Sequence, residues 1–175
     1  MPQASRDIQR RLKSVRNIRK ITRAMELVAA SKMRKSVSRV TASRSYAESA
    51  WQMVMNLIPK TDAKHHPLLE ERPVKKAAVV VIASNRGLCG AFNLNVVNKA
   101  LKLIEKEGWH KDQVDFITFG KKGAQVLASL KKNIVADYPK DDITDEVADV
   151  LPVSEEIIRG FIEKKYDEVC LAYTD

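Results

Sequence analysis

Helix-breaking residues are missing from the first third of the chain, which has neither proline nor glycine between Gln3 and Ile58. Long apolar runs are missing as well, because the longest run, Ala77–Ala83, is far shorter than the roughly 20 residues that a membrane-spanning helix needs. The start MPQASRDIQRR has no apolar segment typical of a secretory signal. We therefore expect a soluble protein with one unusually long helix.

Patterns typical of metal, cofactor and catalytic sites are also missing. Cys89 and Cys170 match no metal or redox spacing, which favours a reducing compartment, and the adjacent His65 and His66 have no other ligand-type residue at a suitable spacing. The turn after the first expected strand has neither G-x-G-x-x-G nor G-K-[ST], and no histidine lies near Cys89 to act as a base. We predict no catalytic residue, metal, cofactor or small-molecule ligand, and we interpret Cys89 as a packed residue.

Positive charge is concentrated in the same first third of the chain. Residues 1–50 contain 13 Lys or Arg against 3 acidic residues, a net charge of +10, whereas residues 51–175 have a net charge of −1. A segment with this charge is attracted to an acidic partner, which could be a nucleic acid, an anionic membrane surface or an acidic protein.

The apolar residues of this basic segment recur mostly every three or four positions. Ser5 followed by Asp7 predicts the start of a helix, and Pro59 predicts its end. A continuous helix over residues 3–58 is about 80 Å long at about 1.5 Å per residue, so we expect it to project beyond the body. Its narrow apolar stripe between basic residues is typical of a coiled coil. The stripe consists of Ile8, Leu12, Val15, Ile18, Ile21 or Thr22, Met25, Val28 or Ala29, Met33, Val37, Val40, Ala47, Trp51, Val54 and Ile58.

Other interpretations of the helix stay open. It could pack on its own domain, although its length argues against this. It could also be the basic arm of a nucleic-acid-binding protein, but its basic and apolar residues are interleaved rather than consecutive as in basic-zipper proteins. No aromatic residue precedes Tyr46 to stack on a base. Nucleic-acid binding is the alternative function, and an enzyme with a site in the turn Gly87–Gly90 is the third.

After a linker over residues 59–76, the pattern changes to that of an α/β body over residues 77–175. Apolar strands are expected at Ala77–Ala83, 114–120, 133–138 and 168–174, and helices at about 93–107, 124–131 and 153–165. We interpret GKKG, residues 120–123, as a strand-to-helix turn. The alternation predicts a Rossmann-like parallel sheet with the order 3-2-1-4 and helices on both faces.

Two stretches resemble a known family. RRLKSVRNIRKITRAMELVAASKMRKS (Arg10–Ser36) is similar to the N-terminal helix of the gamma subunit of F-type ATP synthases, and IASNRGLCGAFN (Ile82–Asn93) resembles that family's second motif. HHPLLEER and FGKKG also match, so the resemblance extends from Ile8 to Asp175. It implies a long coiled-coil helix on a Rossmann-like body, and a non-catalytic central stalk, or rotor, that couples proton-driven rotation to ATP synthesis or hydrolysis.

The resemblance also implies partners and a location. The partners are the alpha and beta subunits of the head, the epsilon subunit and the ring of c subunits in the membrane, with no nucleic acid. The chain would belong to a peripheral complex on the cytoplasmic face of a bacterial membrane, or on the matrix or stroma side in an organelle. Residues implied to contact the lever loops of beta are Lys20, Arg23, Met25, Lys32, Arg34 and Lys35. The family-signature turn comprises Asn85, Arg86, Gly87, Leu88, Cys89 and Gly90.

The sequence departs from the family pattern in two places. Asn85 stands where the family usually has Asp. The family also continues for roughly a hundred residues beyond the position of Asp175, to a long C-terminal helix that forms an antiparallel coiled coil with the first one. We therefore expect this chain to correspond to the N-terminal portion of the family pattern, with the apolar stripe left open.

Overall fold

The computed structural model describes residues 2–61, 66–139 and 147–174. Contacts divide the chain into two compact units, Met1–Asn56 and Leu57–Asp175. In the described part of the chain, no helix combines the length and the apolar character that crossing a bilayer requires.

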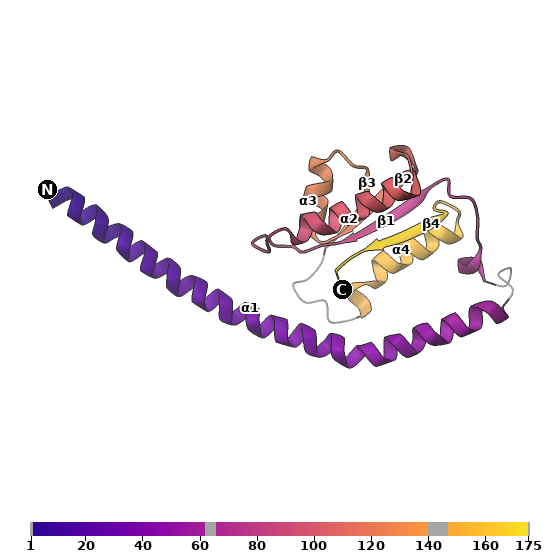
Figure 1. Ribbon diagram of the computed structural model, residues 1–175, viewed down its shortest axis with the longest axis horizontal. Helices are drawn as coiled ribbons and strands as arrows, with labels where there is room; N and C mark the ends of the chain where they lie inside the picture. Colours follow the sequence, from indigo (N-terminus) through magenta and orange to yellow (C-terminus); the bar gives the residue numbers. More distant parts are fainter. Residues whose placement is uncertain (1, 62–65, 140–146, 175) are drawn as a thin grey trace. The chain divides into compact units, whose positions relative to one another are not determined.

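The first unit is a single uninterrupted helix, α1 (Pro2–Leu57), which confirms the long N-terminal helix (Figure 1). The predicted cap at Ser5 is wrong, because the helix already begins at Pro2. Proline suits the first turn, where its missing N–H would have no helical partner. At the other end, the short 3-10 helix η1 (Ile58–Lys60) carries Pro59 at its start and follows α1 directly.

The second unit contains a parallel sheet of four strands among the described residues: β1 (Ala77–Ile82), β2 (Val114–Phe119), β3 (Ile134–Tyr138) and β4 (Glu168–Ala172). Their order is β3-β2-β1-β4, so the predicted order is confirmed (Figure 1). Strand β1 lies in the middle, and Ala77–Val81 are at most 1% exposed. This burial explains why the sequence of β1 is apolar at every position.

Helices cover both faces of the sheet, as predicted. On one face, α2 (Phe92–Glu107) and α3 (Lys121–Ser129) contribute Val96, Val97 and Leu127 to a core with β1 and β2. On the other face, α4 (Leu151–Ile162) contributes Val153, and Tyr166 packs beside it without any exposed surface. The short 3-10 helices are η3 (Pro67–Leu69), η4 (Lys111–Gln113) and η5 (Val147–Asp149).

Two predicted boundaries are wrong for local reasons. Helix α3 begins at Lys121, inside the stretch expected to be a turn, because Gly120 alone reverses the chain with φ 114°. Helix α4 runs from Leu151 to Ile162 rather than over 153–165. Proline fits the first turn of α4 at Pro152, and Lys164, at φ 61°, cannot continue a right-handed helix.

Gly120 is the glycine whose replacement we expect to damage the body most. A Cβ there would collide with the backbone carbonyl of Ala83, in a conformation that L side chains rarely adopt. We expect Gly120→Ala to lower the free energy of unfolding of the body by about 2–4 kcal/mol. The measurement is urea unfolding followed by Trp109 fluorescence in a Trp51→Phe background.

The matched control is Gly87→Ala in the neighbouring turn, where an added Cβ meets nothing within 4 Å. We expect it to change the unfolding midpoint little. Equal midpoints for the Gly120→Ala and Gly87→Ala variants would contradict the assignment of Gly120 as the turn that needs glycine.

Candidate partner-binding surfaces

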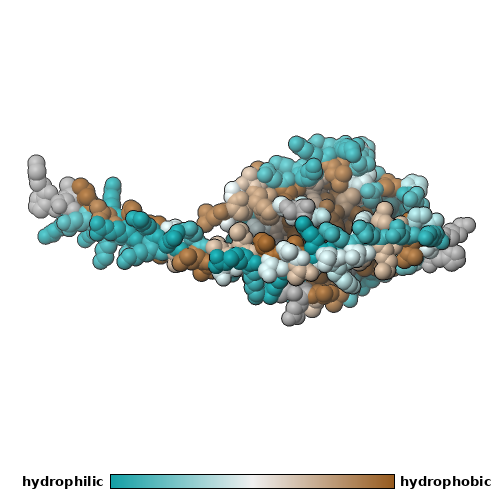
Figure 2. Space-filling model, turned by 60° about the horizontal axis from the view of Figure 1, so that its bottom comes forward, coloured by the Kyte–Doolittle hydropathy of each residue, from teal (hydrophilic) through white to brown (hydrophobic). Residues whose placement is uncertain are grey.

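The apolar stripe of α1 is exposed along the helix. Its larger members are between 47% and 66% exposed, and Figure 2 shows apolar and hydrophilic side chains alternating along the N-terminal arm. A helix gains most of its stability from packing an apolar face, so this stripe indicates a surface for a partner. These members are Ile8, Leu12, Val15, Ile18, Ile21, Met25, Val28, Met33, Val37, Val40, Trp51 and Val54.

The six residues predicted to contact lever loops fall into separate groups around α1. At about 100° per residue, Lys20, Arg23 and Arg34 lie within about 60° of one another. Met25 and Lys32 lie within about 20° of each other, and Lys32 is about 180° from Arg23. Met25 is itself a member of the apolar stripe, Lys32 lies beside it on the helix surface, and Lys35 lies about 60° from Lys32. The helix therefore does not bring the six residues together on one face.

Arg23 forms an ion pair with Glu26, one turn along the helix. Arg23 Nη1 lies 2.7 Å from Glu26 Oε2, and the two side chains are 67% and 63% exposed. Exposed pairs of this kind contribute only about 0.3–0.5 kcal/mol. The guanidinium can therefore exchange Glu26 for a carboxylate of a partner at little cost.

The family-signature turn is organised by a residue that the sequence analysis missed. Asn93, in the first turn of α2, is buried, and its Oδ1 accepts hydrogen bonds from the N–H (2.9 Å) and hydroxyl (3.0 Å) of Ser84. Its Nδ2 donates to Cys89 Sγ at 3.2 Å. Asn85 Oδ1 accepts from the N–H of Lys121 at 3.3 Å, which ties the turn to α3. Arg86 is exposed.

Leu88 is fully exposed in the turn and has a left-handed backbone with φ 63°. Gly90 also has positive φ, 59°, which confirms a tight turn, but nothing lies within 4 Å of a Cβ at Gly87 or Gly90. These glycines therefore do not serve close packing of a helix against a strand. The turn instead projects away from the helix, so its glycines are explained by the backbone conformation of the turn.

The two cysteines lie in different environments. Cys89 is exposed, so its interpretation as a packed residue is wrong, because the projecting turn lifts it away from the sheet. Burial, with the carboxylates of Glu168 and Glu107 nearby, raises the pKa of the Cys170 thiol to about 11. His66 Nδ1 accepts a hydrogen bond from the N–H of Leu68 at 3.3 Å, and His65 lies outside the described residues.

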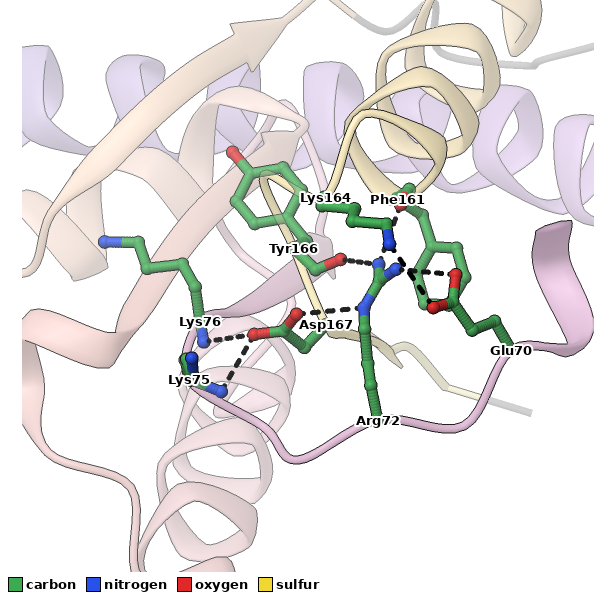
Figure 3. A network of polar contacts seen from close by, with 8 residues as sticks. All are labelled: Glu70, Arg72, Lys75, Lys76, Phe161, Lys164, Tyr166 and Asp167. Carbon is green, nitrogen blue, oxygen red and sulfur yellow. Dashed lines mark hydrogen bonds and ion pairs between the residues drawn. The ribbon is translucent and has the colours of Figure 1, made fainter.

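Arg72 anchors the segment that leads into β1 (Figure 3). Its Nε lies 2.9 Å from Asp167 Oδ1, and both side chains are nearly buried. Its Nη2 donates to the backbone carbonyls of Phe161 (2.7 Å) and Tyr166 (2.6 Å), and the guanidinium lies 4.3 Å from the centre of the Phe161 ring. Arg72 therefore joins the entry of β1 to the end of α4 and the start of β4.

Asp167 completes this anchor from the opposite side. Its Oδ2 accepts from the backbone N–H groups of Lys75 (2.8 Å) and Lys76 (3.0 Å). Burial alone would raise the pKa of Asp167, but the two N–H donors and the Arg72 guanidinium outweigh burial and hold the pKa below its ordinary 3.8. The ionised carboxylate is therefore part of the folded structure at neutral pH.

Comparison with known proteins identifies the family. A family model described as ATP synthase matches residues 4–175. This chain belongs to the ATP synthase family. The resemblance found in the sequence is confirmed by curated relatives named ATP synthase gamma chain. The chain is 36% identical to that of Roseiflexus castenholzii over 173 residues, and 38% identical to that of Dehalococcoides mccartyi strain BAV1 over 171 residues.

The chain spans about 60% of the length of these two relatives. The matches cover 98% and 97% of this chain but 60% and 59% of the relatives. A solved structure of the Tetrahymena thermophila mitochondrial ATP synthase, central stalk and c-ring, is also similar, with a TM-score of 0.61 and 25% identity. This match covers 86% of this chain and 63% of that one. The α/β fold with a long N-terminal helix is thus shared with an ATP synthase central stalk.

We expect the Arg72–Asp167 anchor of this ATP synthase family member to make stability depend on pH. The variant Asp167→Asn keeps the shape but removes the charge beside Arg72, and it should lower the free energy of unfolding by about 2–4 kcal/mol at pH 7. Because the folded pKa is lowered, the contribution of Asp167 is complete above the ordinary value of 3.8 and is lost as the pH falls through the folded pKa.

The measurement is the urea unfolding midpoint between about pH 3 and pH 7, with Glu71→Gln as an exposed carboxylate control. The gap between the wild-type protein and the Asp167→Asn variant should narrow below about pH 4. A gap that stays constant over the whole pH range would rule out the ionised carboxylate as its source.

Proposed function

We propose that this chain acts as the central-stalk, or rotor, part of a proton-translocating F-type ATP synthase and carries no catalytic site of its own. Its family membership and the printed names of its relatives support this function. The observation that carries the proposal is the distribution of basic residues around α1. Lys20, Arg23 and Arg34 lie on one side of the helix, and Lys32 lies on the opposite side from Arg23.

This distribution suits a helix that is surrounded by similar partners. A one-sided interface needs its contacts within one narrow face of the helix, whereas Arg23 and Lys32 are about 180° apart. A shaft inside a ring of alternating alpha and beta subunits meets the same acidic loop of beta from different directions. Both flanks then find a partner as the shaft turns.

The apolar stripe and the basic flanks can be occupied together. A second helix of the family pattern, antiparallel to α1, covers the stripe in this proposal. Lys20, Arg23 and Arg34 lie about 140–180° from Met25 and stay outside such a helix pair, whereas Lys32 lies at its edge. The coiled coil therefore supplies stiffness, and the flanks supply contacts with the head.

Asymmetry then gives the mechanism of coupling. A single shaft presents a different face to each of the beta subunits, so their conformations and nucleotide affinities differ at any moment. Rotation moves each face to the next subunit and so converts torque into a change of affinity. Lys and Arg side chains suit this role, because their attraction to carboxylates tolerates sliding.

The body has a separate role in this proposal. It packs beside the epsilon subunit and holds the foot of the stalk over the c-ring, on the cytoplasmic face of a bacterial membrane or the corresponding side of an organelle. The signature turn, with the fully exposed Leu88 and the exposed Arg86, is the part of the body that we assign to a protein contact. Small molecules and nucleic acids are not partners in this proposal.

The double variant Arg23→Glu and Lys32→Glu tests the contact on both flanks of α1. In a complete ATP synthase complex, we expect proton-driven ATP synthesis to fall about tenfold, because each reversal turns an attraction to an acidic loop into repulsion. ATP hydrolysis by the head should fall less, so the ratio of the two activities reports coupling.

The matched control is Lys99→Glu and Lys102→Glu on the exposed face of α2, which changes the net charge of the chain equally. It should leave the coupling ratio within about twofold of the wild-type value. If α1 reversal leaves proton-driven synthesis unchanged, or if both double variants reduce it alike, the assigned contact is wrong.

A further inference from the structure

Lysines gather at the edge of the sheet where the strands begin. In a parallel sheet the N-terminal ends of all strands lie at one edge, and lysines precede all four strands of the described body. Lys75 and Lys76 precede β1, and Lys111 lies just before β2. The remaining lysines are Lys131 and Lys132 before β3, and Lys164 and Lys165 before β4.

Some of these lysines already have acidic partners. Lys76 Nζ lies 2.9 Å from the buried Asp115 carboxylate, Lys164 pairs with Glu70 at 3.5 Å, and Lys165 pairs with Glu156 at 3.3 Å. In the part of the chain that the structure describes, no ion pair engages Lys111, Lys131 or Lys132. Positive charge is therefore available near the starts of β2 and β3.

These three lysines surround an apolar groove of about 430 Å³. Its walls come from the end of α2, the loop around Trp109 and the start of β2. The lining also includes Glu105 and Asp112, so one positive charge is in excess. The apolar side chains are Leu101, Ile104, Trp109, Val114 and Phe116. Leu130, next to the lysines before β3, is 45% exposed.

Helix capping accounts for only part of this arrangement. Lys131 and Lys164 follow α3 and α4 with positive φ, 53° and 61°, where a positive charge favours the helix C-terminus. Lys111 has no such explanation, because it lies in η4 directly before β2. Capping also does not explain why the lysines are grouped around an apolar groove.

The choice of lysine over arginine separates this surface from α1. The groove lining contains three lysines and no arginine, whereas α1 contains nine arginines and four lysines. Protein interfaces are enriched in arginine and depleted of lysine. Lysines beside a tryptophan are instead typical of proteins that lie on anionic membrane surfaces.

We propose that this groove, with Lys111, Lys131 and Lys132 around Trp109, binds an anionic phospholipid of the membrane surface. The lysine ammonium groups hold the anionic headgroup, and the apolar lining receives the upper part of the acyl chains. A groove of about 430 Å³ has the size of a small-molecule site and is small for a protein helix. The proposal extends the proposed function by adding a lipid contact of the foot, and its test needs no other ATP synthase subunit.

Trp109 is a specific reporter, because Trp51→Phe leaves it as the single tryptophan of the chain. The Trp51→Phe protein is mixed with vesicles that contain brominated acyl chains, made of either phosphatidylglycerol or phosphatidylcholine. We expect quenching of Trp109 to be at least about threefold stronger with phosphatidylglycerol, and to fall in about 0.5 M salt. Membrane binding through the basic helix α1 is distinguished from binding at the groove by the lysine variants described next.

The variant Lys111→Gln, Lys131→Gln and Lys132→Gln should lose this quenching, with its fold checked by circular dichroism. The matched control removes three lysines elsewhere in the same layer, Lys99→Gln, Lys102→Gln and Lys121→Gln, and should keep it. The lipid dependence of the Trp51→Phe protein stands as a test even where the triple variant fails to fold.

Three outcomes would overturn the proposal: co-sedimentation with vesicles without quenching of Trp109, equal quenching by both lipids, or quenching retained in the triple variant. Polyglutamate that changes Trp109 fluorescence when vesicles do not would show a site for acidic protein instead. Because head subunits are not used, a negative result leaves the proposed rotor function standing.

Discussion

The ion pair between Arg72 and Asp167 is the interaction on which the transition from the long helix to the sheet depends. Any force that passes along the chain between α1 and β1 must pass through the residues between Leu57 and Ala77. Arg72 fixes this segment to the end of α4 and the start of β4, and Asp167 fixes Lys75 and Lys76 beside it. The N-terminal end of β1, the central strand of the sheet, is therefore fixed in place.

The body and α1 obey different physical constraints. The body needs no partner to bury its core. Helices cover β1 on both faces of the sheet, and β1 is hydrogen-bonded to β2 on one edge and to β4 on the other. Helix α1 leaves its apolar stripe exposed and its charges on both flanks. A self-contained body joined to a helix that needs partners is the arrangement that the rotor proposal requires.

Much of the fold could be predicted from the sequence because its signals are local. The lack of proline and glycine before Ile58 predicts α1, and the apolar run at Ala77–Ala83 predicts a central strand. The boundary errors also have local causes, such as the single glycine that forms the turn before α3. The exposure of Cys89 could not be predicted, because it depends on how far the turn projects from the sheet.

The anchor and the organisation of the signature turn were missed for another reason. Arg72 and Asp167 are both common surface residues, and nothing in the sequence pairs them until the fold places β4 beside β1. Asn93 could have been recognised as a polar residue in the first turn of a helix, but its bonds to Ser84 and Cys89 depend on the shape of the turn. The lever-loop contacts on α1 remain a prediction, because only the complex with the partner subunits would test them.

The most direct test of the rotor proposal is assembly with purified alpha and beta subunits. The chain is mixed with both subunits and nucleotide in the presence of duplex DNA as a competitor, and the products are separated by size exclusion with light scattering. The account predicts one chain bound to each hexameric head, undisturbed by DNA. Binding to DNA in place of the head would contradict it and would support the basic arm of a nucleic-acid-binding protein.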